Sequence, residues 1–518
     1  MRGKSIMLQG TGSSVGKSML CAALCRIFRE DGLRVAPFKS QNMALNSFAT
    51  KEGLEMGRAQ VVQAQAAGVE PSVEMNPILL KPTSDKKSQV ICLGRPIGNM
   101  GAVEYQNYKP NLRKLVKDTY DSLESKYDAV VIEGAGSPAE INLKEGDLVN
   151  MWMAEAADAP VLLVGDIDRG GVFASLYGTV MLLEPEERAR IKGMIVNKFR
   201  GDVRILEPGL RMIEEKVGIP VIGVVPWTDV DIEDEDSVSE RLTAVSGTGE
   251  ITVAVVRLKH ISNFTDFQAL SLHPGVTLKY ALRPSDLDGA DVVILPGTKN
   301  TIDDLIDLRN RNMLAAIVRH ARSGKLLLGV CGGYQMLGQV LRDPHGVESA
   351  APEVAGLGLL DMEVTFEPEK RTVQARGTLT DAADWLAPLA GVRVEGYEIH
   401  SGVNRFGEGA RFWMRLGGDG AAIDGACNAA GNVLGTYLHG LFDDGQLADA
   451  LVKRARRLKG LPEVPVTAEQ AAVNMAAYRE RQFDLLAKAV RESLDMEKVY
   501  AILRGEENSD LSGRGIRE

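Results

Sequence analysis

Apolar residues in the first half of the chain gather in short runs, and these runs alternate with stretches in which apolar residues recur every three or four positions. The first pattern predicts buried strands and the second predicts amphipathic helices. Strands are predicted at 5–9, 34–38, 129–133, 161–166, 193–197 and 221–225, with helices at 17–29 and 205–217. This alternation predicts an α/β domain in which helices cover both faces of a doubly wound parallel sheet.

An acidic segment, residues 229–240, interrupts the pattern and is interpreted as a solvated linker between two domains. A second α/β series follows it. Its predicted strands are 252–257, 277–282, 291–295 and 326–330, with a helix at 305–322 and further β-like segments from 359 to 439. Helices are expected at 447–458 and 468–494, and the polar tail from Glu506 is expected to fray. The predicted units are 1–235, 250–442 and a helical extension, 443–518.

Composition narrows the classes of function. A chain of 518 residues exceeds one ordinary core. Its formal net charge of −10 disfavours a nucleic-acid binder, although a local basic pocket is compatible with a small anionic substrate. Five cysteines without framework spacing indicate reduced thiols. Neither a long apolar run nor a signal-type segment is present, so we expect a soluble cytoplasmic protein that does not bind membranes.

A phosphate-binding loop is predicted between the first strand and the first helix, where the sequence reads Gly-Thr-Gly-Ser-Ser-Val-Gly-Lys-Ser from position 10. The common pattern places its first glycine at the position that Thr11 occupies here. Backbone N–H groups at a helix N-terminus still favour a phosphate, and a ligand-free turn is the alternative. The residues predicted to bind ATP here are Gly12, Ser13, Val15, Gly16, Lys17 and Ser18.

A carboxylate is also needed if Ser18 is to hold magnesium. Glu133 ends a predicted strand at the sheet edge where ligands collect in open α/β folds, and Asp166 ends another such strand. Either residue could instead cap the turn that follows it. Glu133 is the preferred metal ligand, and Asp166 is the second candidate.

A second chemical signature is Gly-Val-Cys-Gly-Gly at 329–333, which follows an apolar run. Glycines on both sides of Cys331 are typical of a nucleophile elbow, whereas a buried structural cysteine is the alternative. His439 closes a β-like run and is the predicted base, with His400 as its rival. A nucleotide site together with a cysteine nucleophile indicates a synthetase that generates its own ammonia.

These motifs carry a resemblance to a known family. Gly329 to Gln335 and Tyr437 to Gly440 resemble a class I glutamine amidotransferase domain of the cobyrinic-acid-amidating type. The first half resembles the dethiobiotin-synthetase-like ATPase domain of the same ligases. The segments that carry this second likeness are the phosphate loop, 39–46, 76–82, 133–137 and 165–171, and the segment 296–301 supports it. The resemblance implies a flavodoxin-like α/β fold for the second domain.

The resemblance also implies a reaction: amidation of the b, d, e and g carboxylates of adenosylcobyrinic acid a,c-diamide, with ATP and glutamine, to give adenosylcobyric acid. Asn197 matches the family's adenine-reading asparagine. The backbone N–H groups of Gly332 and of the Gly297 loop are expected to stabilise the oxyanion. The residues expected to host the corrinoid are Lys39, Gln41, Asn42 and Asn46, with a ligand-free capped loop as the alternative.

One departure concerns the residue that orients His439. Many class I amidotransferases have a glutamate two positions after the histidine, but this chain has Leu441 there. A Cys331/His439 dyad is therefore expected, with Glu398 as a guess for the orienting group. Two other functions stay open: a cobyrinic acid a,c-diamide synthase, and a regulatory P-loop ATPase fused to an inactive amidotransferase-like module.

Overall fold

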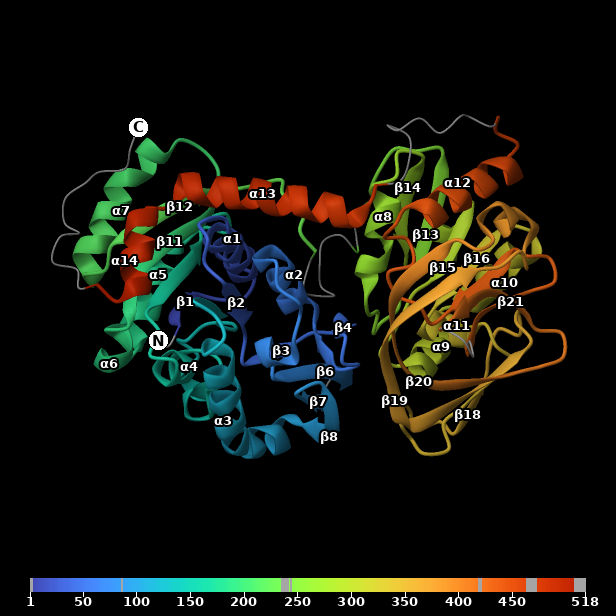
Figure 1. The fold of residues 1–518 in the computed structure, drawn as a ribbon, viewed down its shortest axis with the longest axis horizontal. Helices are drawn as coiled ribbons and strands as arrows, with labels where there is room; N and C mark the ends of the chain where they lie inside the picture. Colours follow the sequence, from blue (N-terminus) through green and yellow to red (C-terminus); the bar gives the residue numbers. More distant parts are fainter. Residues whose placement is uncertain are drawn as a thin grey trace.

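The computed structural model describes residues 3–84, 87–233, 242, 245–417, 422–462 and 473–506. The chain forms two lobes that lie side by side, one built mainly from its first half and the other from its second (Figure 1). Among the described residues, no helix combines the length and the apolar character needed to cross a membrane.

The first lobe is built around a parallel sheet with the strand order β12-β11-β10-β1-β9-β2. Its strands are β1 (Lys4–Gly10), β2 (Val35–Phe38), β9 (Ala129–Glu133), β10 (Val161–Asp166), β11 (Ile191–Phe199) and β12 (Val221–Pro226). The predicted strands and the doubly wound fold are confirmed. Because side chains alternate along a strand, Met7 packs on one face of the sheet while Ile6 and Leu8 pack on the other.

Helices cover both faces of this sheet. One face packs mainly on α3, α4, α5 and α7, and the other packs on α1. The helices of the lobe are α1 (Lys17–Glu30), α2 (Arg58–Ala67), α3 (Ala102–Glu124), α4 (Met151–Ala156), α5 (Val172–Leu182), α6 (Pro185–Arg188) and α7 (Val203–Val217).

Between β2 and α3 the chain forms smaller sheets that the hydrophobic pattern did not predict. They contain β3 (Gln41–Met43), β4 (Ser47–Ala49), β5 (Glu55–Gly57), β6 (Ile78–Ser84), β7 (Lys87–Cys92) and β8 (Arg95–Gly101). In Figure 1 these strands lie on the side of the first lobe that faces the second. This places the predicted corrinoid-binding run, 39–46, near the boundary between the lobes.

The second lobe contains one mixed sheet. Its parallel part has the order β14-β13-β15-β16-β23, and an antiparallel part continues from β22 through β21 to β19. The strands are β13 (Ile251–Val256), β14 (Val276–Ala281), β15 (Val292–Leu295), β16 (Leu326–Val330), β17 (Val340–Arg342), β18 (Glu353–Ala355), β19 (Met362–Leu379), β20 (Arg393–Phe406), β21 (Arg411–Leu416), β22 (Ala422–Cys427) and β23 (Val433–Thr436). The expected α/β domain is confirmed.

The helices of the second lobe include one correction. The predicted single helix at 305–322 is wrong: α9 (Thr301–Asn310) and α10 (Met313–Arg322) are separated at Asn312, whose left-handed φ of 58° is incompatible with a continuous helix. The remaining helices before the extension are α8 (Gln268–Ser271) and α11 (Gly332–Met336).

The C-terminal helices pack against both lobes. Helix α12 (Gln446–Leu458) packs into the core of the second lobe, whereas α13 (Met475–Ser493) and α14 (Met496–Arg504) cover the α1 face of the first-lobe sheet. Figure 1 shows α13 running from the second lobe across the first. The predicted helix at 468–494 is confirmed over 475–493; its start at 468–472 and most of the tail from Glu506 lie outside the described residues.

The interpretation of 229–240 as a solvated linker is wrong at Glu233, although Asp229 is exposed. Glu233 is buried between two guanidinium groups, Arg58 of α2 at 2.6 Å and Arg479 of α13 at 2.7 Å. Burial by itself raises the pKa of this carboxyl, but the charges of Arg479 and Arg58 outweigh it and lower the pKa to about 2. The rest of the acidic run, 234–240, lies outside the described residues.

Replacing the buried carboxylate should therefore destabilise the protein. We expect Glu233→Gln to reduce the free energy of unfolding by about 3 kcal/mol or more, because it removes the carboxylate that pairs with the buried Arg58 and leaves Arg479 with Asp443 alone. Urea denaturation would measure the loss. Since the folded pKa lies below the ordinary value of 4.5, the difference between the two proteins should be full at pH 7 and shrink as the pH falls from 4.5 toward about 2.

The matched control is Glu480→Gln on α13. Glu480 also pairs with an arginine, Arg26, but its side chain is 51% exposed, so we expect a change of less than about 1 kcal/mol. Equal effects of the two substitutions would contradict the role assigned to Glu233.

Candidate active sites

The phosphate-binding loop joins β1 to α1. Gly16 precedes the helix with a φ of 97°, and a Cβ there would lie 2.1 Å from Nδ2 of Asn197. That amide donates to the backbone oxygen of Val15 at 2.8 Å. Asn197, at the carboxyl end of β11, is thus brought against the loop, and glycine is favoured at position 16 because its φ lies in the left-handed region. Ser13 lies exposed at the tip of the loop.

Lys17 crosses the loop from the first turn of α1. Its ammonium donates to the backbone oxygen of Gly12 at 2.8 Å and to that of Gly136 at 3.0 Å. Gly136 follows β9, so this cation links the phosphate loop to the neighbouring strand end. A buried, hydrogen-bonded ammonium at a helix N-terminus is suited to stabilise phosphate oxygens.

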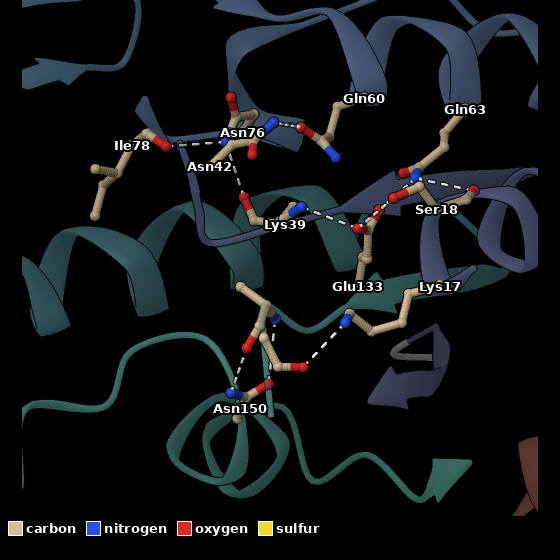
Figure 2. Close-up of polar contacts among 12 residues, drawn as sticks. Lys17, Ser18, Lys39, Asn42, Gln60, Gln63, Asn76, Ile78, Glu133 and Asn150 are labelled. Atoms are coloured by element: carbon tan, nitrogen blue, oxygen red, sulfur yellow. Dashed lines mark hydrogen bonds and ion pairs between the residues drawn. The ribbon is translucent and has the colours of Figure 1, made fainter. Parts of the chain in front are cut away.

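Glu133 is the centre of a polar cluster at the end of β9 (Figure 2). It accepts hydrogen bonds from Ser18 Oγ at 2.8 Å, from Lys39 Nζ at 2.9 Å and from the side-chain amide of Gln63. Burial by itself raises the pKa of this carboxyl, but the charge of Lys39 and the hydrogen bonds outweigh it and lower the pKa. Glu133 is therefore a carboxylate beside the Ser18 hydroxyl, which is the oxygen donor set that magnesium prefers.

Asp166, the second candidate for the metal, has other partners. Its carboxylate binds Lys198 Nζ at 2.9 Å and accepts from the backbone N–H of Asp168 at 2.9 Å. Lys198 in turn donates to the backbone oxygen of Ser14. Asp166 thus supports the tip of the loop through a lysine, whereas Glu133 contacts Ser18 directly.

The four residues predicted to host the corrinoid lie along one path. Lys39 reaches Glu133, and Gln41 accepts from the hydroxyl of Tyr105 at 2.5 Å. Asn42 donates to the side chain of Gln60 at 3.0 Å, and Asn46 accepts from the backbone N–H of Asn263 at 2.8 Å. The run therefore leads from the phosphate loop to the second lobe.

Cys331 stands between β16 and α11 in a strained conformation, with φ 51° and ψ −110°. A Cβ at Gly333 would lie 2.0 Å from the backbone oxygen of Leu295, and one at Gly332 would lie 2.6 Å from Cγ2 of Thr298. The glycines are therefore required by close approach to β15 and the loop after it. This is the predicted strand-to-helix elbow, with the cysteine at its apex.

His439 follows β23 and is almost fully buried. Its ring lies beside the Cys331 thiol, which donates to the backbone oxygen of Ile399 at 3.5 Å, and its Nδ1 lies 2.7 Å from the carboxylate of Asp266. Burial by itself lowers the pKa of the imidazole, but the Asp266 charge, with contributions from Cys331, outweighs it and raises the pKa to about 10. Asp266 fixes the ring and favours its positive form, so the three side chains have the arrangement of a catalytic triad.

The guess that Glu398 orients His439 is wrong. Glu398 binds Arg371 at 2.5 Å and lies 3.4 Å from His400, the rival base. The His400 ring stacks on Tyr437 with 3.6 Å between centroids, and its Nδ1 lies 2.8 Å from the Gly402 backbone oxygen. His400 is thus held by other partners, and its described contacts do not include the Cys331 thiol.

Asp266 was not predicted from the sequence, although its position after a strand indicates a place at the ligand-binding edge. The polar segment Ser262 to Asp266 follows β13, and the carboxyl ends of parallel strands meet at the edge where ligands bind. The Gly297 loop, after β15, lies at the same edge: a Cβ at Gly297 would be 3.2 Å from the His439 ring, and one at Gly332 would be 3.2 Å from the Thr298 nitrogen. The two predicted sources of oxyanion donors therefore flank Cys331.

Both halves of the chain match known protein families. Residues 6–238 match the CobQ/CobB/MinD/ParA nucleotide binding domain, which implies the use of ATP. Residues 252–447 match the CobB/CobQ-like glutamine amidotransferase domain.

Similar proteins extend over nearly the whole chain. A protein of Alkaliphilus metalliredigens (strain QYMF) described as cobyric acid synthase is 54% identical over 96% of this chain and 100% of its own length. A cobyric acid synthase of Thermoanaerobacter sp. (strain X514) is 52% identical over 96% of this chain and 98% of its own. Among solved structures, PurLQS from Thermotoga maritima is 20% identical, with a TM-score of 0.30, over 40% of this chain and 98% of its own.

Proposed function

The chain belongs to the cobyric acid synthase family, and on that premise we propose that it amidates the b, d, e and g carboxylates of adenosylcobyrinic acid a,c-diamide. Membership of the family makes it an enzyme of cobalamin biosynthesis, a glutamine-hydrolysing ligase that uses ATP, glutamine and a corrinoid. The observation that carries the proposal is the presence, in one chain, of the Ser18–Glu133 pair at a phosphate loop and of Cys331 beside His439.

The number of amidations distinguishes this reaction from that of an a,c-diamide synthase. We expect incubation of the a,c-diamide with ATP, magnesium and glutamine to give a corrinoid that carries four new amides. Replacing each hydroxyl of a carboxyl group by NH2 lowers the mass by about 1 Da per site, so high-resolution mass spectrometry would count them. ATP hydrolysis without any amide product would instead favour the regulatory ATPase.

In the synthetase reaction, a substrate carboxylate attacks the γ-phosphorus of ATP and ADP leaves, which forms an acyl phosphate. Lys17 donates to the phosphate oxygens, and Ser18 and Glu133 would hold magnesium, which when bound spreads the negative charge of the phosphates. Ammonia then attacks the acyl carbon and phosphate leaves. We propose that Asn197 reads the adenine and that Lys39, Gln41, Asn42 and Asn46 bind the corrin's carboxylates and amides.

In the glutaminase reaction, the Cys331 sulfur attacks the side-chain carbonyl carbon of glutamine while His439 takes the thiol proton. The proton passes to the leaving nitrogen, ammonia departs, and water hydrolyses the thioester to glutamate. Asp266 holds the ring and stabilises its positive form, and the N–H groups of Gly332 and of the Gly297 loop stabilise the oxyanion. Residues 1–235 would act as the amidoligase and 250–442 as the amidotransferase, with 443–518 as the extension.

Loss of the loop lysine should stop synthesis whatever the nitrogen source. We expect Lys17→Ala to lower amide formation at least ~100-fold with glutamine or ammonium, because the phosphate oxygens lose a fixed cation. Glu133→Gln should require more magnesium for half-maximal rate. A magnesium titration of ammonium-dependent synthesis measures both variants, with Asp166→Asn as the control that should leave the magnesium requirement unchanged. A raised magnesium requirement in the Asp166 variant but not in the Glu133 variant would show that Asp166 binds the metal instead.

Substitutions at the elbow should separate the two reactions. We expect Cys331→Ala and His439→Ala to abolish glutamine-dependent amidation and to keep amidation from ammonium salt at alkaline pH, since NH3 then reaches the acyl phosphate directly. Asp266→Asn should lower glutamine hydrolysis ~100-fold or more. The double variant of Cys331 and His439 should be no worse than either single one. Loss of ammonium-dependent synthesis in a folded Cys331→Ala variant would contradict the two-site reaction.

A further inference from the structure

Asn263 lies between the His439 ring and the first lobe. It is buried, and it adopts a left-handed φ of 51°, a conformation that asparagine tolerates better than most residues. Its backbone N–H donates to Oδ1 of Asn46 at 2.8 Å, and its own Oδ1 accepts from the backbone N–H of Ser47 at 2.9 Å. Its Nδ2 lies 3.4 Å from Nε2 of His439. One residue of the second lobe thus joins the histidine to two residues of the first.

The contact with Ser47 determines which way the amide of Asn263 faces. A backbone N–H requires an acceptor, so the oxygen of the amide must point toward Ser47. The NH2 group then points toward Nε2 of His439, which can accept its hydrogen bond only while it carries a lone pair. The contact with Ser47 of the first lobe therefore determines that the His439 ring meets the NH2 group of Asn263 and not its oxygen.

The two nitrogens of His439 consequently meet opposing influences. Asp266 at Nδ1 favours the positive ring, whereas a donor at Nε2 favours the neutral one and occupies the lone pair that must take the proton of Cys331. Tyr397 is a further titratable side chain against the ring, stacked at 5.1 Å between centroids. In this arrangement the Asn263 amide competes with the thiol for the base.

Ser47 in turn belongs to a buried charged group that spans the lobes. Its hydroxyl donates to Glu55 at 2.8 Å and accepts from Lys81 at 2.9 Å, and Lys370 of the second lobe binds the other oxygen of Glu55. Ser47 also directly follows the run 39–46 that we propose to bind the corrinoid. A ligand on that run would act on the backbone that orients the Asn263 amide.

We propose that Asn263 is a positioning residue that restrains His439 while the corrinoid run is empty and releases it when the substrates of the first lobe bind. The inference rests on the proposed function, because it requires glutamine hydrolysis in one lobe and corrinoid binding in the other. Release consists of a turn of the amide away from Nε2 once Ser47 no longer holds its oxygen, which leaves the lone pair to the thiol.

The test compares glutamine hydrolysis with and without ATP, magnesium and the corrinoid. In the unaltered protein we expect the substrates to raise kcat at saturating glutamine. In Asn263→Gly, which adopts the same φ without strain, the rate without substrates should rise ~10-fold and the ratio of the two rates should approach one. Asn263→Asp keeps an acceptor for Ser47 but has no NH2, so its ratio should also approach one whatever its absolute rate.

The matched control is Gln374→Ala, which removes another hydrogen bond between the lobes, from Gln374 to the backbone oxygen of Ala49, without touching His439. Its ratio should equal that of the unaltered protein. An unaltered protein without stimulation, or Asn263 variants that keep the normal ratio, would overturn the inference. Ammonium-dependent amidation in the same preparations shows that the variants are folded, and its absence from the unaltered protein would count against the proposed function instead.

Discussion

The arrangement of the whole chain depends on one buried ion cluster, in which the carboxylate of Glu233 lies between the guanidinium groups of Arg58 and Arg479. Arg58 comes from the first lobe and Arg479 from the C-terminal helix α13, and Arg479 also binds Asp443 near the end of the second lobe at 3.1 Å. Burying these charges is unfavourable unless each meets its partner. Since the partners come from three distant parts of the sequence, the cluster favours a single arrangement of lobes and helix. That arrangement lets α13 and α14 cover an apolar face of the first-lobe sheet.

Both reaction sites then follow from the parallel sheets. In each lobe, strands end at an edge where the backbone turns into loops or helices, and the chemical groups gather there. In the first lobe Lys17 and Ser18 follow β1, Glu133 ends β9, and Asn197 lies near the end of β11. In the second lobe Asp266 follows β13, Cys331 follows β16, and His439 follows β23. The close approaches at Gly16 and Gly333 show the packing that this convergence demands. The reactive side chains of each lobe therefore lie at the ends of short strands, and the hydrophobic core around those strands holds them in place.

The sequence predicted the parts of this arrangement that depend on local pattern. Buried strands leave continuous apolar runs, and glycines around Lys17 and Cys331 mark turns that other residues enter only with strain. The orienting residue Asp266 was missed because its partner lies far away in sequence, and Glu398, offered only as a guess, meets Arg371 instead. Glu233 resembled a solvated charge for the same reason, since its two arginines are distant in sequence. Among the strands between 41 and 101, β3, β4 and β5 have three residues each and β8 is mostly exposed, so neither an apolar run nor an alternation identified them.

The position of the histidine between the lobes has a chemical consequence. A thiol and an imidazole that formed a permanent ion pair would hydrolyse glutamine whether or not an acyl phosphate awaited the ammonia. Asp266 at Nδ1 drives the ring toward its positive form, and this effect is strong because the pair is buried. A neutral amide donor at Nε2 opposes it without adding a charge, and it can be withdrawn by rotation of a single side chain. A carboxylate or a lysine at position 263 would fix one protonation state, so an asparagine oriented by the backbone of Ser47 is suited to a base that must respond to the other lobe.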